Sequence, residues 1–128
     1  MKSLLEHMDQ SGSIALDTEA DSLYHYYHKV CLIQLTFDAQ NYIIDPLSKT
    51  DLKPFLKLLS KKPLILHDAG YDLRMMQSTF DFTPHGKVFD TMLAAQLLGH
   101  TKFGLGSLVE KYFGVVIDRK STRLNSSH

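Results

Sequence analysis

Residues 14–21 of the chain read Ile-Ala-Leu-Asp-Thr-Glu-Ala-Asp, and this stretch indicates the fold. Side chains two residues apart share one face of a strand, so a strand over Ile14–Ala20 points Asp17 and Glu19 the same way. Burying two neighbouring carboxylates is costly unless a cation lies between them. Hard oxygen ligands of this kind suit Mg²⁺ or Mn²⁺. The pair by itself fits a metal site and a strand end with two solvated acids equally well.

The composition is that of one globular domain without a strong charge. The chain has 128 residues, 44% of them hydrophobic, and its 14 basic and 14 acidic residues balance to a net charge of zero. A broad positive surface for nucleic acid is therefore not expected. Cys31 is the single cysteine, so the chain offers it no disulfide partner and fits a reducing compartment. No apolar run resembles a signal peptide or a membrane span, and we expect a cytoplasmic protein that does not enter a membrane.

The hydrophobic periodicity predicts an α/β domain with a mixed sheet of about five strands flanked by helices. The strand at Val30–Phe37 is almost continuously apolar, which predicts a central strand buried on both faces. Residues 1–11 are too short for us to expect more than a frayed helix or a leader. Further strands are expected at Tyr42–Ile44, Pro63–Leu66 and Val88–Phe89, and helices at Leu52–Ser60, Tyr71–Phe80, 91–98 and Ser107–Phe113, the last with a Ser107/Glu110 capping box.

A third acid, Asp72, falls in the first turn of the helix at Tyr71–Phe80. The apolar stripe of this helix consists of Leu73, Met76 and Phe80, and the spacing places Asp72 beside it. A negative charge at a helix start is favourable in itself. If the strand before this helix runs parallel to the first strand, Asp72 can also face Asp17 and Glu19 as a third ligand.

Five motifs in order resemble the ribonuclease D branch of the DEDD 3′–5′ exonucleases. They are ALDTEAD at 15–21, VCLIQL at 30–35, IDPL at 44–47, HDAGYDLR at 67–74 and FDTMLAAQLL at 89–98. The resemblance covers about residues 13–118. It implies a ribonuclease H-like fold and hydrolysis of phosphodiester bonds from the 3′ end of RNA, or of DNA, by a two-metal-ion mechanism with Mg²⁺ or Mn²⁺.

The resemblance also implies roles for individual residues. Asp17 and Glu19 fill the first family motif and Asp72 the second, as catalytic metal ligands. Asp17 would bridge both ions, Glu19 would hold the ion that activates water, and Asp72 would support the second ion. The backbone near Thr18 would contact the terminal nucleotide, and His67 would line the same cleft. The implied partner is a nucleic acid with a free 3′ end, RNA before DNA.

One family motif, a Tyr shortly before a fourth acid, is not found, since Tyr112 falls too early and no acid follows in register. Residues 1–118 are therefore expected to form a partial exonuclease domain. The polar tail at 119–128 resembles a translated adapter scar and is expected to be disordered and non-native. We expect this chain to be weakly active or inactive and the apolar residues of its last helix to be uncovered. The alternative is a catalytically silent nucleic-acid-binding or scaffolding domain with the same fold.

Overall fold

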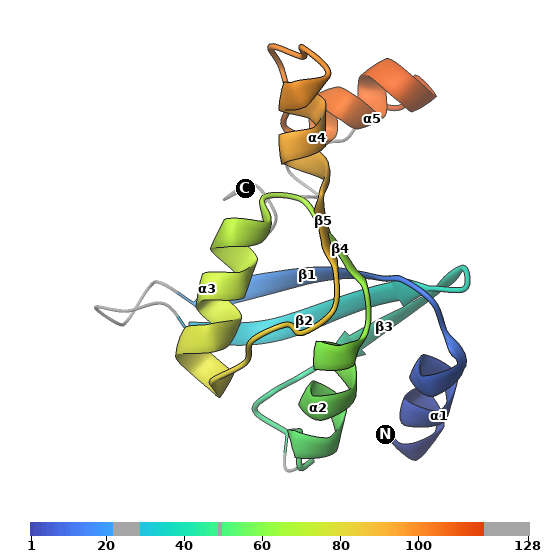
Figure 1. Ribbon diagram of the computed structural model, residues 1–128, viewed down its shortest axis with the longest axis vertical. Helices are drawn as coiled ribbons and strands as arrows, with labels where there is room; N and C mark the ends of the chain where they lie inside the picture. Colours follow the sequence, from blue (N-terminus) through green and yellow to red (C-terminus); the bar gives the residue numbers. More distant parts are fainter. Residues whose placement is uncertain (22–28, 49, 117–128) are drawn as a thin grey trace.

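A computed structural model describes residues 1–21, 29–48 and 50–116 (Figure 1). The disorder predicted for residues 119–128 concerns a segment outside these ranges. The described elements follow the predicted order, with one additional helix at the start. The helices are α1 (Lys2–Gln10), α2 (Lys53–Lys61), α3 (Ala69–Phe80), α4 (Thr91–Leu97) and α5 (Leu105–Phe113), and the strands are β1 (Ile14–Asp21), β2 (Lys29–Phe37), β3 (Gln40–Ile44), β4 (Leu64–Leu66) and β5 (Val88–Asp90).

The five strands form one mixed sheet in the order β3-β2-β1-β4-β5. The first three strands make an antiparallel meander, in which β1 pairs with β2 and β2 with β3. The crossovers through α2 and α3 add β4 and β5, each parallel to its neighbour. The predicted mixed sheet is confirmed, and β1 lies at its centre. In Figure 1, α3 crosses one face over β1 and β2, whereas α4 and α5 lie beyond the ends of β4 and β5.

The first helix is part of the core, so the prediction of a frayed helix or leader is wrong for residues 2–10. Leu4 and Met8, one turn apart on α1, are both buried in the core cluster. His7, on the same helix, contacts the β2–β3 hairpin through Tyr42, whose hydroxyl lies 2.7 Å from Nδ1, and Asp38, whose carboxylate lies 3.0 Å from Nε2. Sequence periodicity could not foresee these contacts because they join residues more than thirty positions apart.

Strand β2 is buried on one face only, which corrects the prediction of burial on both. Ile33, Leu35 and Phe37 point into the core, whereas Gln34 between them is half-buried and Thr36 is exposed. The helices α1, α2 and α3 contribute their apolar residues to a single core cluster with this inner face. From Ile33 to Phe37 the sequence alternates between apolar and polar residues, and one covered face satisfies that part of the pattern.

The last helix begins earlier than predicted and carries uncovered apolar surface. Its N-cap is Gly104 without a side-chain cap, so Ser107 lies inside α5 and the predicted capping box is wrong. The C-terminal end at Gly114, with φ of 69°, agrees with the prediction. Tyr112 and Phe113 are 58% and 76% exposed, as expected. Within the described ranges no helix is long and apolar enough to cross a membrane.

Gly86 closes the loop before β5 against the end of α2, and we predict that Gly86→Ala destabilises the fold. A Cβ there would lie 2.6 Å from the carbonyl oxygen of Lys62 and 2.9 Å from its carbon, so backbone has to move. We expect a loss of about 1–3 kcal/mol in the free energy of unfolding, measured by urea denaturation. Gly12→Ala is the control, since its added Cβ meets nothing within 4 Å. Equal stabilities for the two variants would contradict the prediction.

Candidate active site

The acidic pair lies on β1, at the centre of the sheet. Residues 15–19 pair regularly with β2, and the register shifts between Glu19 and Ala20. Alternation along the regular part places Asp17 and Glu19 on the face opposite Thr18, which points with Leu16 toward the helices. The predicted common orientation of Asp17 and Glu19 thus agrees with the strand geometry. Asp17 is half-buried and Glu19 is only 8% exposed.

Asp72 lies within the buried face of α3, not beside it as predicted. The buried residues of this helix are Ala69, Asp72, Met75 and Met76. Asp72 is 1% exposed and its Oδ1 accepts a hydrogen bond of 2.6 Å from the hydroxyl of Thr18, which is also 1% exposed. The apolar stripe predicted the helix correctly but not its rotation, because a buried hydroxyl can satisfy a buried acid and no local pattern reports it.

The strand geometry places Asp72 on a different face of β1 from the acidic pair. Alternation puts Asp17 and Glu19 on one face of the strand, whereas Asp72 meets Thr18 on the face that α3 covers. Pairing between β1 and β4 is described only for Ile14 and Ala15. Beyond Ala15, the described pairing thus leaves the edge of β1 beside the acids without β4.

The donor types at this segment fit a hard divalent cation. Thr18, Glu19 and Asp72 are the buried polar or charged residues found in the described ranges, and two of them are carboxylates. Buried carboxylates are costly without hydrogen bonds or a cation. The arrangement is not a finished metal site, since the described residues contain no group of three or more His, Cys, Asp or Glu placed to hold an ion. A shared metal site for Asp17, Glu19 and Asp72 stays a prediction.

Asp90, the last residue of β5, joins the starts of two helices. Its carboxylate accepts hydrogen bonds from the backbone N–H groups of Met92 and Leu93 in α4, at 2.9 and 3.3 Å. It also accepts bonds of 3.0 Å each from the N–H groups of Asp68 and Ala69, where α3 begins. Asp68 has a φ of 64°, a left-handed conformation that is unfavourable for a residue with a Cβ. Asp90 thus holds the strained turn that leads into the helix of Asp72.

The pKa of Asp90 reflects these contacts. Burial raises the pKa of Asp90, but the four backbone hydrogen bonds together lower it by more than burial raises it. The pKa of Asp90 therefore lies below the ordinary value of 3.8. Asp90 is the N-cap of α4, directly before the helix predicted at 91–98, and the sequence analysis did not predict its bonds to the start of α3. The expected parallel strands could have indicated these bonds. Parallel neighbours such as β4 and β5 end at the same edge of the sheet, which brings Asp90 close to the residues that follow β4.

His67 follows β4 and is held by the start of α4. The Thr91 hydroxyl lies 2.9 Å from Nδ1 of His67 and 3.2 Å from the carbonyl oxygen of Leu66, so the three groups form one hydrogen-bonded cluster. Contact of His67 with a nucleotide stays a prediction. The Thr18 hydroxyl donates to Asp72, and contact of the Thr18 backbone with a nucleotide also stays a prediction.

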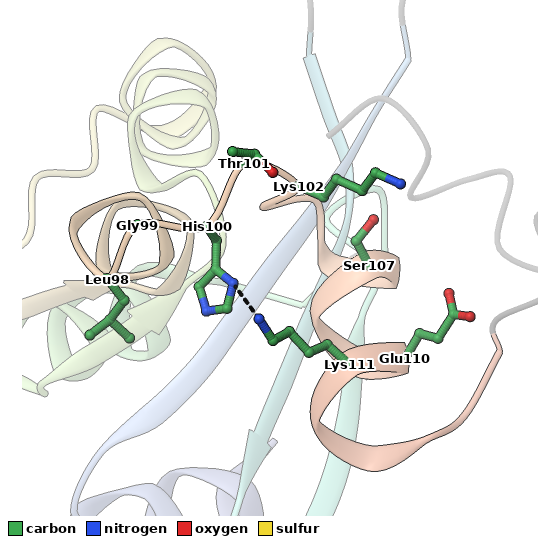
Figure 2. Close-up of a pocket in the computed structure, with 8 residues that line it drawn as sticks. All are labelled: Leu98, Gly99, His100, Thr101, Lys102, Ser107, Glu110 and Lys111. Carbon is green, nitrogen blue, oxygen red and sulfur yellow. Dashed lines mark hydrogen bonds between the residues drawn. The ribbon is translucent and has the colours of Figure 1, made fainter.

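A separate hollow lies where α4 meets α5 (Figure 2). The Lys111 ammonium lies 3.4 Å from Nδ1 of His100, and Nε2 of His100 lies 2.6 Å from the Tyr112 hydroxyl. Lys102 and Glu110 also line it, so the charges in the hollow are mixed. None of the residues that line this hollow belongs to the predicted site.

The sequence matches the family model described as 3′-5′ exonuclease over residues 1–127. The chain belongs to this 3′-5′ exonuclease family. Ribonuclease D of Haemophilus influenzae is 39% identical over 119 residues, which cover 91% of this chain and 30% of that protein. The crystal structure of Escherichia coli RNase D, an exoribonuclease involved in structured RNA processing, matches with a TM-score of 0.84 at 34% identity, over 94% of this chain and 33% of that one.

Membership of the 3′-5′ exonuclease family confirms the resemblance to ribonuclease D and, with the structural match, the ribonuclease H-like fold. A structure of NrnC from Brucella melitensis contains bound Mg²⁺. It shares the fold with a TM-score of 0.72 at 24% identity, over 85% of this chain and 57% of that one. The chain spans about a third of the length of the ribonuclease D proteins that it matches.

Proposed function

We propose that this chain carries the nucleotide-binding and metal-binding part of a cytoplasmic 3′-5′ exonuclease that acts on RNA in preference to DNA. The observation that carries the proposal is the burial of the motif acids Glu19 and Asp72, at 8% and 1% exposure, in a member of the 3′-5′ exonuclease family. A fold does not keep two carboxylates this far from water without compensation. Asp72 accepts one hydrogen bond from Thr18, and a divalent cation would be a further partner for these carboxylates.

The three acids would divide the work as the family resemblance implies. When bound, Mg²⁺ or Mn²⁺ ions lower the pKa of the attacking water and stabilise charge on the attacking and leaving oxygens. Asp17 would hold both ions, Glu19 the ion beside the water, and Asp72 the ion beside the leaving oxygen. His67 and the backbone at Thr18 would contact the terminal nucleotide.

A second candidate is a catalytically silent domain that binds nucleic acid or serves as a scaffold. The observation that favours it is the missing third motif, since no Tyr followed by a fourth acid in register occurs among the 128 residues. The retained acids favour the enzyme, because a silent domain has no use for buried carboxylates.

The two candidates differ in an exonuclease assay. We expect the 128-residue chain to shorten a 5′-labelled single-stranded RNA very slowly with Mn²⁺. The same chain, extended by the segment that carries the third motif in ribonuclease D proteins, is expected to be at least about a hundredfold faster, since one lost catalytic group typically costs that much. EDTA and Asp17→Asn in the longer form are the controls for a contaminating nuclease. Full activity of the 128-residue chain would show that three acids suffice. No activity in the extended chain would favour the silent domain.

A further inference from the structure

We propose that three lysines on the outer side of α2, Lys53, Lys57 and Lys61, bind backbone phosphates of an RNA strand away from its 3′ end. These three residues are called the lysine row below. The inference rests on the proposed function, because it adds a second contact surface for the same RNA. Neither the family motifs nor the candidate active site includes a residue of α2.

The lysine row is a line of exposed positive charge. Its members are spaced by four residues, so they lie along one side of α2, and all of them are exposed. The helical rise separates neighbours by about 6 Å and spreads the row over about 12 Å. No acidic residue occurs in α2. The row therefore suits a ligand that carries several negative charges in a line, as a nucleic-acid backbone does.

The ammonium groups of the lysine row are not used by the fold. Within the described part of the chain, they form no hydrogen bond and no ion pair. Lys62, the residue after the row, shows the contrast. Its Nζ donates to the carbonyl oxygens of Asp9 and Ser11, at 3.0 and 2.9 Å, and so ties the end of α2 to the end of α1. Lys62 thus serves the structure, whereas the lysine row is available to a ligand.

The lysine row is largely unfavourable for the helix that carries it. Lys53 is the first residue of α2, where the helix dipole is positive and an acid would be stabilising. Like charges four residues apart repel each other, and this spacing occurs twice along the row. Lys61, in the last turn, is the member that the dipole favours. Bound phosphates would neutralise the repulsion, so binding offsets a cost that the free helix carries.

The lysine row does not face the acidic pair. Phe55 and Leu59, on the other side of α2, are buried in the same core as Leu16. Strand alternation places Asp17 and Glu19 on the opposite face of β1 from Leu16. The helix α2 thus covers the sheet face opposite the acidic pair, and the row lies on its outer side. An RNA whose 3′ end lies at the acids reaches the row only with nucleotides further upstream.

A nucleic acid fits the lysine row better than a membrane. Amphipathic helices that bind a membrane bury their apolar face in the lipid. The apolar face of α2 is already buried in the core, through Phe55 and Leu59. The chain also belongs to a nuclease family, the members of which act on strands of regularly spaced phosphates.

The test measures binding of a fluorescein-labelled, single-stranded RNA of about 20 nucleotides to the 128-residue chain by fluorescence anisotropy. EDTA is present, so neither hydrolysis nor a bound metal contributes. The row variant carries Lys53→Gln, Lys57→Gln and Lys61→Gln, and glutamine has nearly the helix propensity of lysine. We expect about tenfold weaker binding at low salt. The plot of log affinity against log salt should be shallower by about 2, because each single-strand phosphate contact contributes about 0.7.

Three comparisons separate the lysine row from a general effect of charge or folding. The matched control carries Lys87→Gln, Lys102→Gln and Lys111→Gln, which removes the same three charges from exposed sites outside α2, and should bind within about twofold of wild type. Replacing the row with three arginines keeps the charges and should retain the affinity. A circular RNA of the same length, which has no 3′ end, should lose the same factor in the row variant. Thermal melting is recorded for each protein.

Four results would overturn the inference. Wild-type protein that binds no RNA, or a row variant with unchanged affinity and salt dependence, would show that the lysines are only solvated. An equal loss in the matched control would trace the effect to net charge. A loss confined to the linear RNA would place the row at the 3′ end. Binding of phosphatidylserine vesicles in place of RNA would assign the row to a membrane surface. The exonuclease assay decides the proposed function separately, because it needs the metal and the third motif, and this measurement uses neither.

Discussion

Asp17→Asn is expected to weaken Mn²⁺ binding about a hundredfold and Asp72→Asn about tenfold, measured by calorimetric titration of each folded variant. Under the proposed roles, Asp17 would contact both ions, so replacing its carboxylate with a neutral amide removes two attractions. Asp72 would contact one ion and already shares its Oδ1 with the hydroxyl of Thr18. The difference between the variants therefore reports the division of roles as well as the site itself.

The control for the loss of a negative charge is Asp51→Asn. Asp51 is an exposed acid whose Oδ1 accepts a single backbone bond of 3.0 Å from Lys53, at the start of α2. We expect its Mn²⁺ affinity to equal that of the wild type. Equal losses in the Asp17 and Asp72 variants, or tighter binding after Asp17→Asn, would contradict the assignment of Asp17 as the bridging ligand.

Asp90→Ala is expected to lower the free energy of unfolding by about 2–4 kcal/mol, measured by urea denaturation near neutral pH. The substitution removes the acceptor of four backbone N–H groups at the starts of α3 and α4. It also releases the left-handed turn at Asp68. Asp90→Asn keeps an acceptor oxygen without the charge and should fall between wild type and alanine.

Asp51→Ala serves as the matched control, because it removes one helix-start bond instead of four. A loss of about 1 kcal/mol or less is expected there. If Asp90→Ala costs no more than Asp51→Ala, the joining of the two helix starts contributes nothing to stability.

The contribution of Asp90 also has a defined pH dependence. Because its pKa is lower in the folded protein than the ordinary value of 3.8, the folded state favours the ionised carboxylate. The stabilisation is fully present above the unfolded pKa and is lost as the pH falls through the folded pKa. The gap in stability between wild type and Asp90→Ala should therefore narrow as the pH is lowered from about 7 to about 3. If the difference in stability between wild type and Asp90→Ala grows as the pH falls, the pKa of Asp90 is raised in the folded protein and the prediction is wrong.

The sequence predicted the elements that depend on short-range patterns. The pattern over residues 14–20 predicted β1 and the hydrophobic periodicity over residues 52–60 predicted α2, each within a residue or two of its observed ends. Failures occurred where a local signal had more than one solution. Ser107 and Glu110 have the spacing of a capping box, yet α5 begins two residues before Ser107, at Leu105. A capping box fixes a helix start only if no earlier residue continues the helix.

By itself, the sequence determined the class of fold, the order of the strands along the chain and the spacing of Asp17 and Glu19, since these follow from periods of two and 3.6 residues. Only the tertiary structure decided that Asp72 is buried against Thr18 and that Asp90 joins the starts of α3 and α4. Those contacts link residues 54 and about 22 positions apart. Their partners are set by the parallel pairing of β4 with its neighbours and the rotation of α3 on the sheet. Neither leaves a periodic trace in the sequence, because a hydrogen bond between distant side chains requires one residue at each end and no repeating pattern.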